Sequence, residues 1–285
     1  MSPSLSIIIN SAVKQLSNSD TPRLDIEILL CHVLKKNRSY LYTWPQNQLT
    51  DSQYIQFQNL LTQRVKGEPI AYLIGHKEFW SLDLQVTRNT LIPRPETELL
   101  VEQALIRLPS NSPSEIIDLG TGTGAIALAI AKERPQSQII AIDKFPQTLQ
   151  VAQNNAQRLK LYNIEFVVSD WLANNLKTVN LIISNPPYIN LADPHLTQGD
   201  VQYEPRSSLV AGMDGLKDIK QIIAQSYKYL LNQGWLLLEH GYNQAEQVRH
   251  LLTKSNYQTI TTYNDLAGQP RVTGGQKCIN FGMRI

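Results

Sequence analysis

The spacing of apolar residues in the first quarter of the chain is that of helices. Residues 1–74 contain no run in which apolar and polar positions alternate, and apolar side chains recur every three or four positions instead. Pro22 stands where the first turn of one helix is expected, and Thr50 with Gln53 forms a capping-box pair before another. The two apolar series behind these signals are Leu24, Ile28 and Cys31, and Tyr54, Phe57 and Leu61. We therefore expect a small domain of several short helices.

The pattern changes between residues 75 and 98. Apolar positions then alternate loosely with polar ones, which indicates a β-hairpin or a short extended linker. These positions are Phe79, Leu82, Leu84 and Val86. The segment ends in Pro93-Arg94-Pro95, and the two prolines restrict the backbone on both sides of Arg94. So stiff a stretch is interpreted either as a wall of a site or as a hinge between domains.

Strands and helices alternate from residue 115 onward. We expect strands at 116–119, 138–143, 166–171 and 181–184, and helices at 125–134 and 149–159. This alternation predicts right-handed βαβ units in a doubly wound parallel sheet, which is an α/β, Rossmann-like fold. Ligands of such sheets bind beyond the carboxyl ends of the strands, so the residues that follow each strand are the candidates for a site.

A long polar connection, 189–215, separates these units from the last part of the chain. Connections of this length are typical of functional loops, and this one is a candidate for covering the site or docking a substrate. After it we expect a helix at 216–231, a strand at 235–238, a helix near 244–252, and a closing antiparallel pair at 259–263 and 277–281. His240 directly follows one of these strands, and we expect it to cap the strand and not to act as a base.

Composition narrows the class of protein. The chain of 285 residues is 42% hydrophobic and 18% charged, as in a globular protein, and its net charge of +2 does not favour a polyanionic partner. Cys31 and Cys278 lack the spacing of metal ligands, and the five histidines form no ligand pair, so we expect no metal site. Residues 1–15 lack a basic leader and no window is long enough to span a membrane, so we expect a cytoplasmic protein without membrane contact.

A glycine-rich loop, 120–124, lies between the first expected strand and its helix. Glycines let the backbone approach a ligand closely, and the helix N-terminus favours an anionic group. Gly120, Gly122 and Ala125 also satisfy a dinucleotide-binding pattern, which leaves a nicotinamide enzyme as an alternative. Asp143 ends the next strand, where a carboxylate can hold ribose hydroxyls. The candidate cofactor contacts are Gly120, Thr121, Gly122, Thr123, Gly124, Asp143, Asp170, Trp171 and Asn185.

The fourth expected strand ends on Asn185-Pro186-Pro187-Tyr188. The prolines fix the backbone and lack N–H donors, so this corner presents carbonyl oxygens and one amide side chain. Asn185 and a neighbouring main-chain carbonyl can accept both protons of a planar –NH2 group, on which Tyr188 can stack. Holding both protons turns the nitrogen lone pair towards an electrophile. These four residues are the candidate catalytic and substrate-binding residues; the alternative is a plain proline-rich turn.

Four elements together resemble the amino-group methyltransferases that use S-adenosyl-L-methionine. They are Asp-Leu-Gly-Thr-Gly-Thr-Gly at 118–124, Asp143, Asp170-Trp171 and the Asn-Pro-Pro-Tyr corner. The resemblance implies S-adenosyl-L-methionine and not NAD as cofactor, with S-adenosyl-L-homocysteine as product. Enzymes that methylate adenine, guanine or glutamine nitrogen share the Asn-Pro-Pro-Tyr signature, so it indicates the chemistry and not the acceptor.

Further motifs look like those of the peptide chain release factor glutamine methyltransferases. They are Gly-Glu-Pro-Ile-Ala-Tyr at 67–72, Ile-Pro-Arg-Pro-Glu-Thr-Glu at 92–98, Asn-Pro-Pro-Tyr-Ile at 185–189, Glu-Pro at 204–205, Glu-His-Gly-Tyr-Asn-Gln at 239–244, and Asp-Leu-Ala-Gly at 265–268 with Arg271. The resemblance covers the chain from about residue 64 to residue 271. Ser208 stands where the family usually has alanine, and the preceding pair Arg206-Ser207 varies within the family. Neither departure is expected to touch the chemistry.

The resemblance implies an enzyme of three parts: a helical substrate-docking domain at 1–74, a β-hairpin linker at 75–98 and a methyltransferase domain at 99–285. Such an enzyme transfers a methyl group to the side-chain amide nitrogen of the glutamine in the Gly-Gly-Gln motif of release factors, a protein methylation that acts on translation termination. Its partner is the release factor, and no nucleic acid is needed. The methylated nitrogen can lose its proton to water, so we assign no general base.

Several alternatives stay open on the sequence. The helical domain is either a structural cap or a platform for a protein partner. A glutamine methyltransferase of a ribosomal protein would share most of the motifs, and only the regions of Arg94 and Glu204 argue against it. A nucleic-acid amino methyltransferase would share the catalytic corner, but the chain shows no basic stripe. A non-catalytic cofactor-binding module would leave the Asn-Pro-Pro-Tyr corner without a role.

Overall fold

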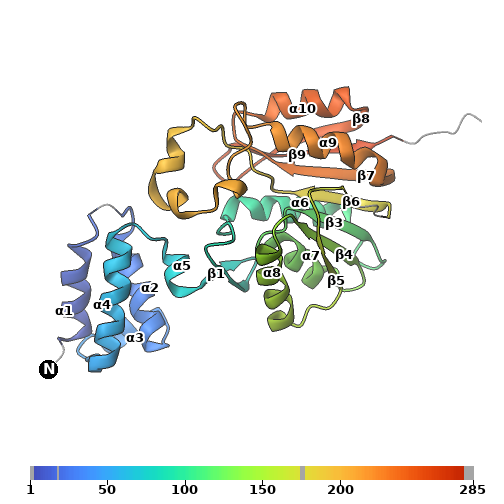
Figure 1. Cartoon of the computed structure of the whole chain (residues 1–285). Helices are drawn as coiled ribbons and strands as arrows, with labels where there is room; N and C mark the ends of the chain where they lie inside the picture. The colour runs from blue at the N-terminus through green and yellow to red at the C-terminus, as the bar shows by residue number, and fades with distance from the viewer. Residues whose placement is uncertain (1–2, 18, 174–176, 279–285) are drawn as a thin grey trace, which may run out of the picture. The chain divides into compact units, whose positions relative to one another are not determined.

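A computed structural model describes residues 3–17, 19–173 and 177–278, which fold into two compact units (Figure 1). The first unit contains Met1–His76 together with His195–Tyr203, and the second contains Lys77–Pro194 and Glu204–Ile285. The chain therefore passes from one unit to the other three times. No helix among the described residues is long and apolar enough to cross a membrane.

The first unit is built from five α-helices in its described part, and two short 3-10 helices, η2 (Pro194–Thr197) and η3 (Gly199–Tyr203), lie in or at the edge of its second segment. The five α-helices are α1 (Leu5–Val13), α2 (Pro22–Leu34), α3 (Arg38–Thr43), α4 (Asp51–Val65) and α5 (Ile70–Ile74). Pro22 occupies the first turn of α2, and Thr50 and Gln53 form the predicted capping box of α4. The prediction for α4 is confirmed at Phe57 and Leu61, which are buried. The helix predicted behind Pro22 is confirmed as α2, but within its apolar series Leu24 is exposed and Ile28 and Cys31 are only partly buried.

The buried face of α2 is carried by residues one or two positions away from the predicted series. Ile26, Leu29 and Leu30 are fully buried, and they pack with Leu5, Ile8, Phe57 and Leu61 in a single core. Asp25 and Glu27 flank Ile26 and are also buried, since each is held by cationic or hydroxyl partners. Those buried carboxylates interrupt the apolar pattern and explain why the periodicity alone selected the wrong face.

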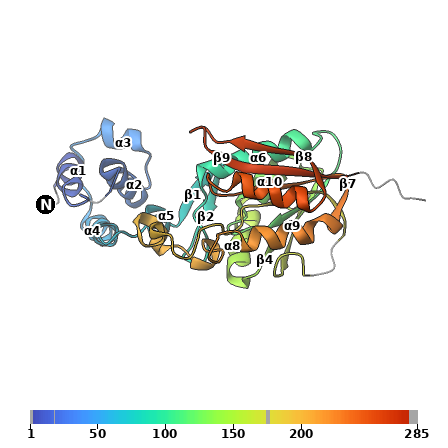
Figure 2. The same ribbon diagram turned by 90° about the horizontal axis from the view of Figure 1, so that it is seen from above.

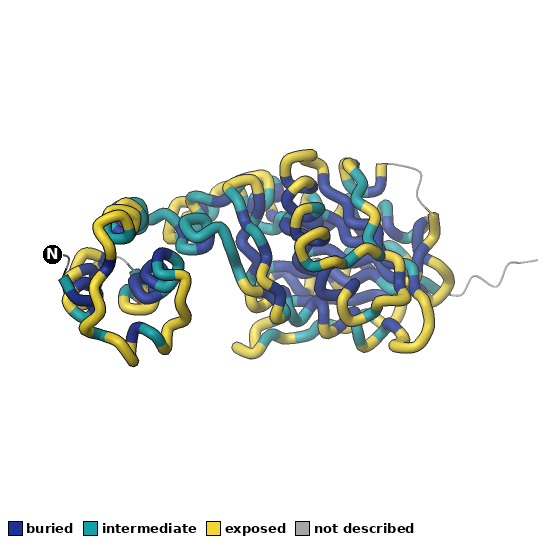
Figure 3. The backbone as a smooth tube through the Cα atoms, turned by 90° about the horizontal axis from the view of Figure 1, so that it is seen from below, coloured by how far each residue is buried: buried dark blue, intermediate teal, exposed yellow. Residues whose placement is uncertain are grey.

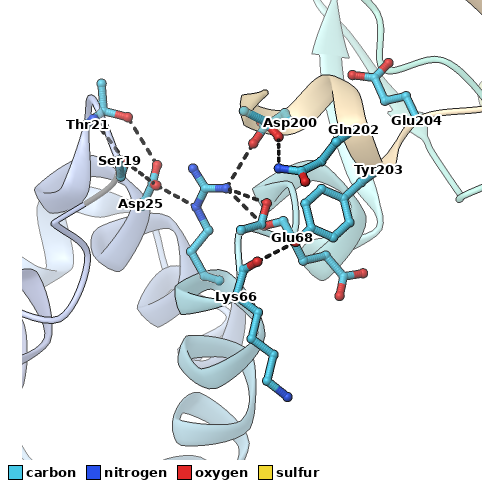
Figure 4. A network of polar contacts seen from close by, with 12 residues as sticks. Ser19, Thr21, Asp25, Lys66, Glu68, Asp200, Gln202, Tyr203 and Glu204 are labelled. Carbon is cyan, nitrogen blue, oxygen red and sulfur yellow. Dashed lines mark hydrogen bonds and ion pairs between the residues drawn. The ribbon is translucent and has the colours of Figure 1, made fainter. Parts of the chain in front are cut away.

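A polar network attaches the segment His195–Tyr203 to the helical unit (Figure 4). Arg64 donates from Nε to Asp25 Oδ2 at 2.8 Å and from Nη1 to Asp200 Oδ1 at 3.0 Å. The Tyr203 hydroxyl donates to the main-chain carbonyl of Lys66. A Cβ at Gly67 would come within 3.0 Å of that hydroxyl, at a φ of +99°. The segment is thus fixed by contacts that sequence periodicity does not reveal.

The hairpin predicted between residues 75 and 98 is confirmed. Strands β1 (His76–Phe79) and β2 (Leu82–Gln85) pair in a two-stranded sheet. Trp80 and Ser81 connect them with φ values of +53° and +54°, as a two-residue type I′ turn requires. Asn155 holds the second strand, because its side-chain amide exchanges hydrogen bonds with the backbone N–H (2.7 Å) and carbonyl (3.0 Å) of Gln85.

A seven-stranded sheet forms the centre of the second unit. Its strands are β3 (Glu115–Leu119), β4 (Gln138–Asp143), β5 (Ile164–Val168), β6 (Val179–Ser184), β7 (Leu230–Glu239), β8 (Tyr257–Asn264) and β9 (Pro270–Lys277). The spatial order is β5-β4-β3-β6-β7-β9-β8, with parallel pairing from β5 to β7 and antiparallel pairing at β9 and β8. The strand order reverses between β3 and β6, which is where a doubly wound sheet opens a crevice.

Helices cover both faces of this sheet (Figures 1 and 2). One core joins the sheet to α6 (Glu98–Arg107) and α7 (Ala125–Glu133), with α8 (Pro146–Leu159) at its edge. The opposite core joins it to α9 (Lys217–Tyr229) and α10 (Ala245–Lys254). Neighbouring strand residues such as Ile116 and Ile117 enter opposite cores, as the period of two in a strand requires. The central strands are accordingly the buried part of the unit (Figure 3).

The position predicted for the last strand is wrong. The expected strand at 277–281 is displaced, since β9 ends at Lys277 and residues 279–281 lie outside the described part of the chain. Gly274 and Gly275 lie inside β9, where a Cβ would come within 2.7 Å of Leu237 and 3.0 Å of Tyr257 respectively. Close packing in the middle of the sheet demands glycine there, and two glycines do not give the apolar signal of a strand.

Arg64 provides a test of the network that holds His195–Tyr203. Its side chain is 13% exposed and lies between Asp25, at 7%, and Asp200, at 41%. Arg64→Ala leaves the Asp25 carboxylate without its cation, and we expect a loss of about 3 kcal/mol in the free energy of unfolding. We also expect faster proteolysis within 195–203. Denaturant titration and limited proteolysis measure both.

Asp200→Asn is the matched control for this prediction. Asp200 is far more exposed than Asp25, so its pairing with Arg64 is weaker and we expect a loss below about 1 kcal/mol. Equal losses for the two variants would contradict the assignment of Arg64 and Asp25 as the dominant pair.

Candidate functional site

A cavity of about 240 Å³ opens at the carboxyl ends of the parallel strands of the second unit. Seven of the residues predicted from the sequence line it, namely Gly120, Gly122, Asp143, Asp170, Trp171, Asn185 and Pro187. Three others belong to the connection 189–215 that was expected to cover the site, and of these Ser207 and Ser208 had been expected to lie away from the chemistry: Ser207, Ser208 and Val210. The sequence did not indicate the remaining seven: Leu91, Ile142, Lys144, Phe145, Ser169, Lys217 and Asp218. The cavity lies at the reversal of strand order between β3 and β6, where the sheet topology leads us to expect a ligand.

The glycine-rich loop contributes its backbone to the cavity, and its other predicted residues are structural. Thr121 donates its hydroxyl to Asp118 Oδ2 at 2.6 Å, and both Thr121 and Thr123 are buried away from the cavity lining. A Cβ at Gly124 would come within 2.9 Å of Leu128 and 3.2 Å of Ala152, so this glycine serves packing between helices. Gly120 and Gly122 are the two that face the ligand space.

Asp143 is positioned as an acceptor of hydroxyl groups. Its Oδ2 accepts the Gly122 N–H at 3.1 Å and its Oδ1 accepts the Phe145 N–H at 3.0 Å. Burial raises the pKa of the carboxyl, and these main-chain donors oppose the rise. Each oxygen keeps a further lone pair for a ligand, because a carboxylate has about four acceptor sites.

Asp118, on β3, is a buried acid that was not among the predicted ligand contacts. It is fully buried, and its pKa is raised to about 7, chiefly by desolvation. Its Oδ1 makes no hydrogen bond of full geometry with a described residue, although the Ala127 N–H lowers the pKa of the carboxyl. The side chain does not line the cavity and lies two residues before Gly120, which does. The sequence signal was an acid at the end of an apolar strand before a glycine-rich loop.

Residues that follow β4 and β5 form a charged and aromatic wall of the cavity. Lys144 Nζ lies 2.9 Å from Asp170 Oδ2, and both side chains are about half exposed. Trp171 adopts a φ of +52°, and its indole hydrogen-bonds Asp218. Burial raises the pKa of Asp218 and the indole opposes that rise. A Cβ at Gly120 would lie 3.3 Å from the Trp171 ring, so the loop and the aromatic side chain are closely packed.

Asn185 follows β6 directly, and the pairing of Ser184 with Leu119 places it beside Gly120. Its Nδ2 donates to the Thr97 hydroxyl oxygen at 3.1 Å, so its acceptor Oδ1 is not used in that contact. The preceding Ser184 donates its hydroxyl to the Leu119 carbonyl at 2.7 Å, which ties the end of β6 to the end of β3. Of the four residues of the corner, Asn185 and Pro187 line the cavity.

Tyr188 lies behind the cavity and does not line it. Its hydroxyl donates to Glu239 Oε1 at 3.2 Å, its ring packs against the sheet core, and its pKa is raised mainly by burial. Its carbonyl accepts from Gln244 Nε2 at 3.0 Å. A Cβ at Gly215 would come within 2.4 Å of the same carbonyl. The backbone of the corner is therefore fixed from two sides.

The Arg94 segment reaches the cavity only through Leu91, and Pro93, Arg94 and Pro95 do not line it. A wall of the site and a hinge both stay predictions for this stiff stretch. Arg94 donates from Nη2 to Glu204 Oε1, while Glu204 Oε2 accepts the Ile92 N–H at 3.3 Å. Glu204 is buried and holds the segment beside the connection that contributes Ser207, Ser208 and Val210 to the lining.

His240 has a structural role, as predicted. It is fully buried, with Nε2 at 2.7 Å from the Thr273 hydroxyl and Nδ1 at 2.9 Å from the Gly241 carbonyl. Burial lowers its pKa, which favours the neutral ring. The side chain joins β7 to β9 and is absent from the cavity lining.

Comparisons with known proteins agree with this architecture. Residues 8–75 match the family described as PrmC N-terminal domain, and residues 110–277 match the family described as Methyltransferase domain. A solved methyltransferase from Pyrococcus furiosus has the same fold, with a TM-score of 0.55 at 16% identity, over 78% of this chain and 100% of that one.

Curated relatives cover nearly the whole chain. The "Release factor glutamine methyltransferase" of Escherichia coli (strain K12) is 50% identical over 269 residues, which is 94% of this chain and 97% of that protein. The protein of the same name from Vibrio cholerae is 49% identical over 281 residues, 97% of this chain and 98% of that protein. This chain belongs to the release factor glutamine methyltransferase family.

Proposed function

We propose that this protein transfers a methyl group from S-adenosyl-L-methionine to the side-chain amide nitrogen of the glutamine in the Gly-Gly-Gln motif of release factors. The observation that carries the proposal is the position of Asn185. Its amide is held at the donor end by Thr97, and it lines the same cavity as Gly120, Gly122 and Asp143. Family membership supports the choice of acceptor.

The residues of the cavity fit S-adenosyl-L-methionine. Asp143 offers two carboxylate oxygens to ribose hydroxyls, and Gly120 and Gly122 leave room for close backbone approach. Trp171 gives an aromatic wall. Asp118 does not line the cavity, but it is a buried acid two residues before Gly120, and its negative charge would favour the cationic methionine end. When bound, the cofactor supplies a methyl group on an electrophilic sulfonium.

Catalysis in this proposal is mainly orientation. Asn185 Oδ1 and a main-chain carbonyl of the corner accept the two N–H bonds of the substrate amide, which turns the nitrogen lone pair towards the methyl group. Pro186 and Pro187 remove competing N–H donors from that wall. The nitrogen becomes acidic once it is methylated and releases its proton to solvent, so no side chain is assigned as a general base.

The helical unit is proposed as the substrate-docking domain. Its described surface exposes large apolar side chains, among them Tyr42 (56%), Trp44 (55%) and Ile55 (61%). Exposed apolar groups of this size are typical of surfaces that bind another protein. The segment His195–Tyr203 belongs to the same unit, so part of the connection that follows the catalytic corner is held by this domain.

The first prediction concerns the cofactor. Asp143→Ala removes charge-assisted hydrogen bonds to the ribose, each contributing about 1.5–3 kcal/mol. We expect S-adenosyl-L-methionine to bind at least about 10-fold more weakly, measured by calorimetry. Asp214→Ala, at an exposed ion pair outside the cavity lining, is the control and should leave the affinity unchanged. Binding of NAD without binding of S-adenosyl-L-methionine would refute the assignment.

The second prediction concerns the acceptor. With labelled methyl donor, we expect incorporation into purified release factor, at the glutamine of its Gly-Gly-Gln motif, and none into ribosomal protein, DNA or RNA. A nucleic-acid enzyme would lose affinity steeply as salt rises, because phosphate contacts release counterions. Mass spectrometry of the labelled peptide identifies the site. Label in nucleic acid at physiological salt would favour the nucleic-acid amino methyltransferases instead.

The third prediction concerns Asn185. Asn185→Ala removes an acceptor that orients the substrate amide, so we expect turnover to fall by about 100-fold with a much smaller change in cofactor affinity. Asn185→Asp keeps two acceptor oxygens and adds negative charge near the sulfonium, so cofactor should bind more tightly while turnover stays low. Asn154→Ala, on the exposed face of α8, is the control. Near wild-type turnover of Asn185→Ala would mean that the corner is only a turn.

A further inference from the structure

Behind the catalytic corner lies a buried carboxylate that the reaction itself does not use. Glu239 is the last residue of β7 and is 1% exposed. Ser184 of β6 pairs with Leu238 of β7, so the register places Asn185 beside Glu239, one residue further along both strands. A buried carboxylate is costly unless it is used, and its place next to the acceptor site requires an explanation.

We propose that Glu239 is a positioning residue that determines, through Thr97, which end of the Asn185 amide faces the substrate. The proposal rests on the proposed function, since it assumes that Asn185 must present its oxygen to an –NH2 group. Thr97 is the link, because it lies between the two side chains and is itself 4% exposed. Neither Glu239 nor Thr97 lines the cavity, so both act through Asn185.

The contacts form a directed chain. Tyr188 donates its hydroxyl to Glu239 Oε1 at 3.2 Å, and Asn185 Nδ2 donates to Thr97 Oγ1 at 3.1 Å. The Thr97 hydroxyl is near enough to the Glu239 carboxylate to lower its pKa, without a hydrogen bond of full geometry. Oε2 has no partner in full hydrogen-bonding geometry among the described residues, so the carboxylate retains acceptor capacity in a buried place.

The charge state of Glu239 determines which groups donate and which accept in the contacts from Glu239 through Thr97 to Asn185. A carboxylate only accepts hydrogen bonds, so Thr97 must donate to it and can then only accept from Asn185. Asn185 is thereby forced to turn Nδ2 towards Thr97 and Oδ1 away from it. An oxygen is the group that an –NH2 substrate needs. The negative charge of Glu239 thus selects the productive orientation of the amide.

Protonation of Glu239 reverses the preference. A carboxylic acid can donate to Thr97, whose own proton is then free to point at Asn185. If the Asn185 amide rotates about its terminal bond, its Oδ1 can accept a hydrogen bond from the Thr97 hydroxyl. Its –NH2 group would then face the –NH2 group of the substrate, and two donors cannot pair. The protonated state is therefore unproductive.

The residues around Glu239 favour a change in its protonation near neutral pH. Burial raises its pKa to about 7, against the lowering effect of Thr97, Tyr188 and Arg271 of β9, while Glu96 raises it further. Arg271 itself pairs with Asp265 at 3.3 Å, which reduces its effect on Glu239. Because the carboxylate is the productive form, turnover should rise with pH through about 7 and fall as the acid form accumulates below it.

The test is the pH profile of turnover at saturating cofactor and release factor. We expect wild type to lose activity on the acid side of about pH 7. Glu239→Gln cannot change its charge, so we expect turnover lower by about 10- to 100-fold and no acid-side loss. Thr97→Val removes the hydroxyl between Glu239 and Asn185, so it should show the same pH profile as Glu239→Gln. Thr97→Ser keeps the hydroxyl and should retain the wild-type profile. An acid-side loss that persists in both Glu239→Gln and Thr97→Val would overturn the proposal.

Tyr188→Phe provides an independent test, because it should shift the pH at which activity is lost. It removes a hydrogen bond that lowers the pKa of Glu239, so the acid-side loss should move to higher pH. A purely structural role of Tyr188 would reduce turnover without moving the profile. Cofactor affinity by calorimetry verifies that each variant is folded, and the Thr97 and Tyr188 variants decide the question if Glu239→Gln does not fold.

A spectroscopic readout separates this inference from the proposed function. In protein labelled with ¹⁵N-asparagine, the Asn185 side-chain –NH2 signal, assigned with Asn185→Asp, should titrate near pH 7 in wild type and not in Glu239→Gln. If the Asn185 signal titrates but release factor is not methylated, the proposed acceptor is wrong and the coupling of Glu239 to Asn185 stands. If release factor is methylated but the signal does not titrate, the acceptor stands and the coupling is wrong.

Discussion

Parallel strands deliver all their carboxyl ends to one edge of a sheet, and this constraint governs the candidate site. The order β5-β4-β3-β6-β7 reverses direction between β3 and β6, so the helices that follow these strands cover opposite faces and leave a crevice between them. Gly120 follows β3, Asp143 ends β4 and Asn185 follows β6. Each residue meets the others because the same edge collects them, although 65 residues separate Gly120 from Asn185 in the sequence.

Two buried carboxylates flank this crevice and bring an electrostatic cost. Asp118 lies at the cofactor side and Glu239 behind the acceptor corner, and burial raises the pKa of each to about 7. Each keeps one oxygen that no described residue satisfies with a hydrogen bond of full geometry. Groups of this kind destabilise a fold, so their concentration at one site indicates use in binding or positioning. The same burial that costs stability makes their charge sensitive to a ligand or to pH.

The connection between the catalytic corner and α9 illustrates how one stretch serves two units. Tyr203 is held by the Lys66 carbonyl in the helical unit, whereas the next residue, Glu204, is held by Arg94 and the Ile92 N–H in the methyltransferase unit. A few residues further on, Ser207 and Ser208 line the cavity. The connection is therefore not a free loop; its anchors on both sides determine where its cavity-lining residues lie.

The sequence by itself determined the features that depend on neighbouring residues: the capping box of α4, the hairpin, the strands that end at Asp143 and just before Asn185, and the family to which these motifs belong. It misplaced the buried face of α2 and the strand β9, because buried carboxylates and packed glycines contradict an apolar pattern. Only the tertiary structure decided the partners of the Asn185 amide. Thr97 lies 88 residues from Asn185, and Glu239 lies beside it through the register of β6 and β7, which no local period encodes.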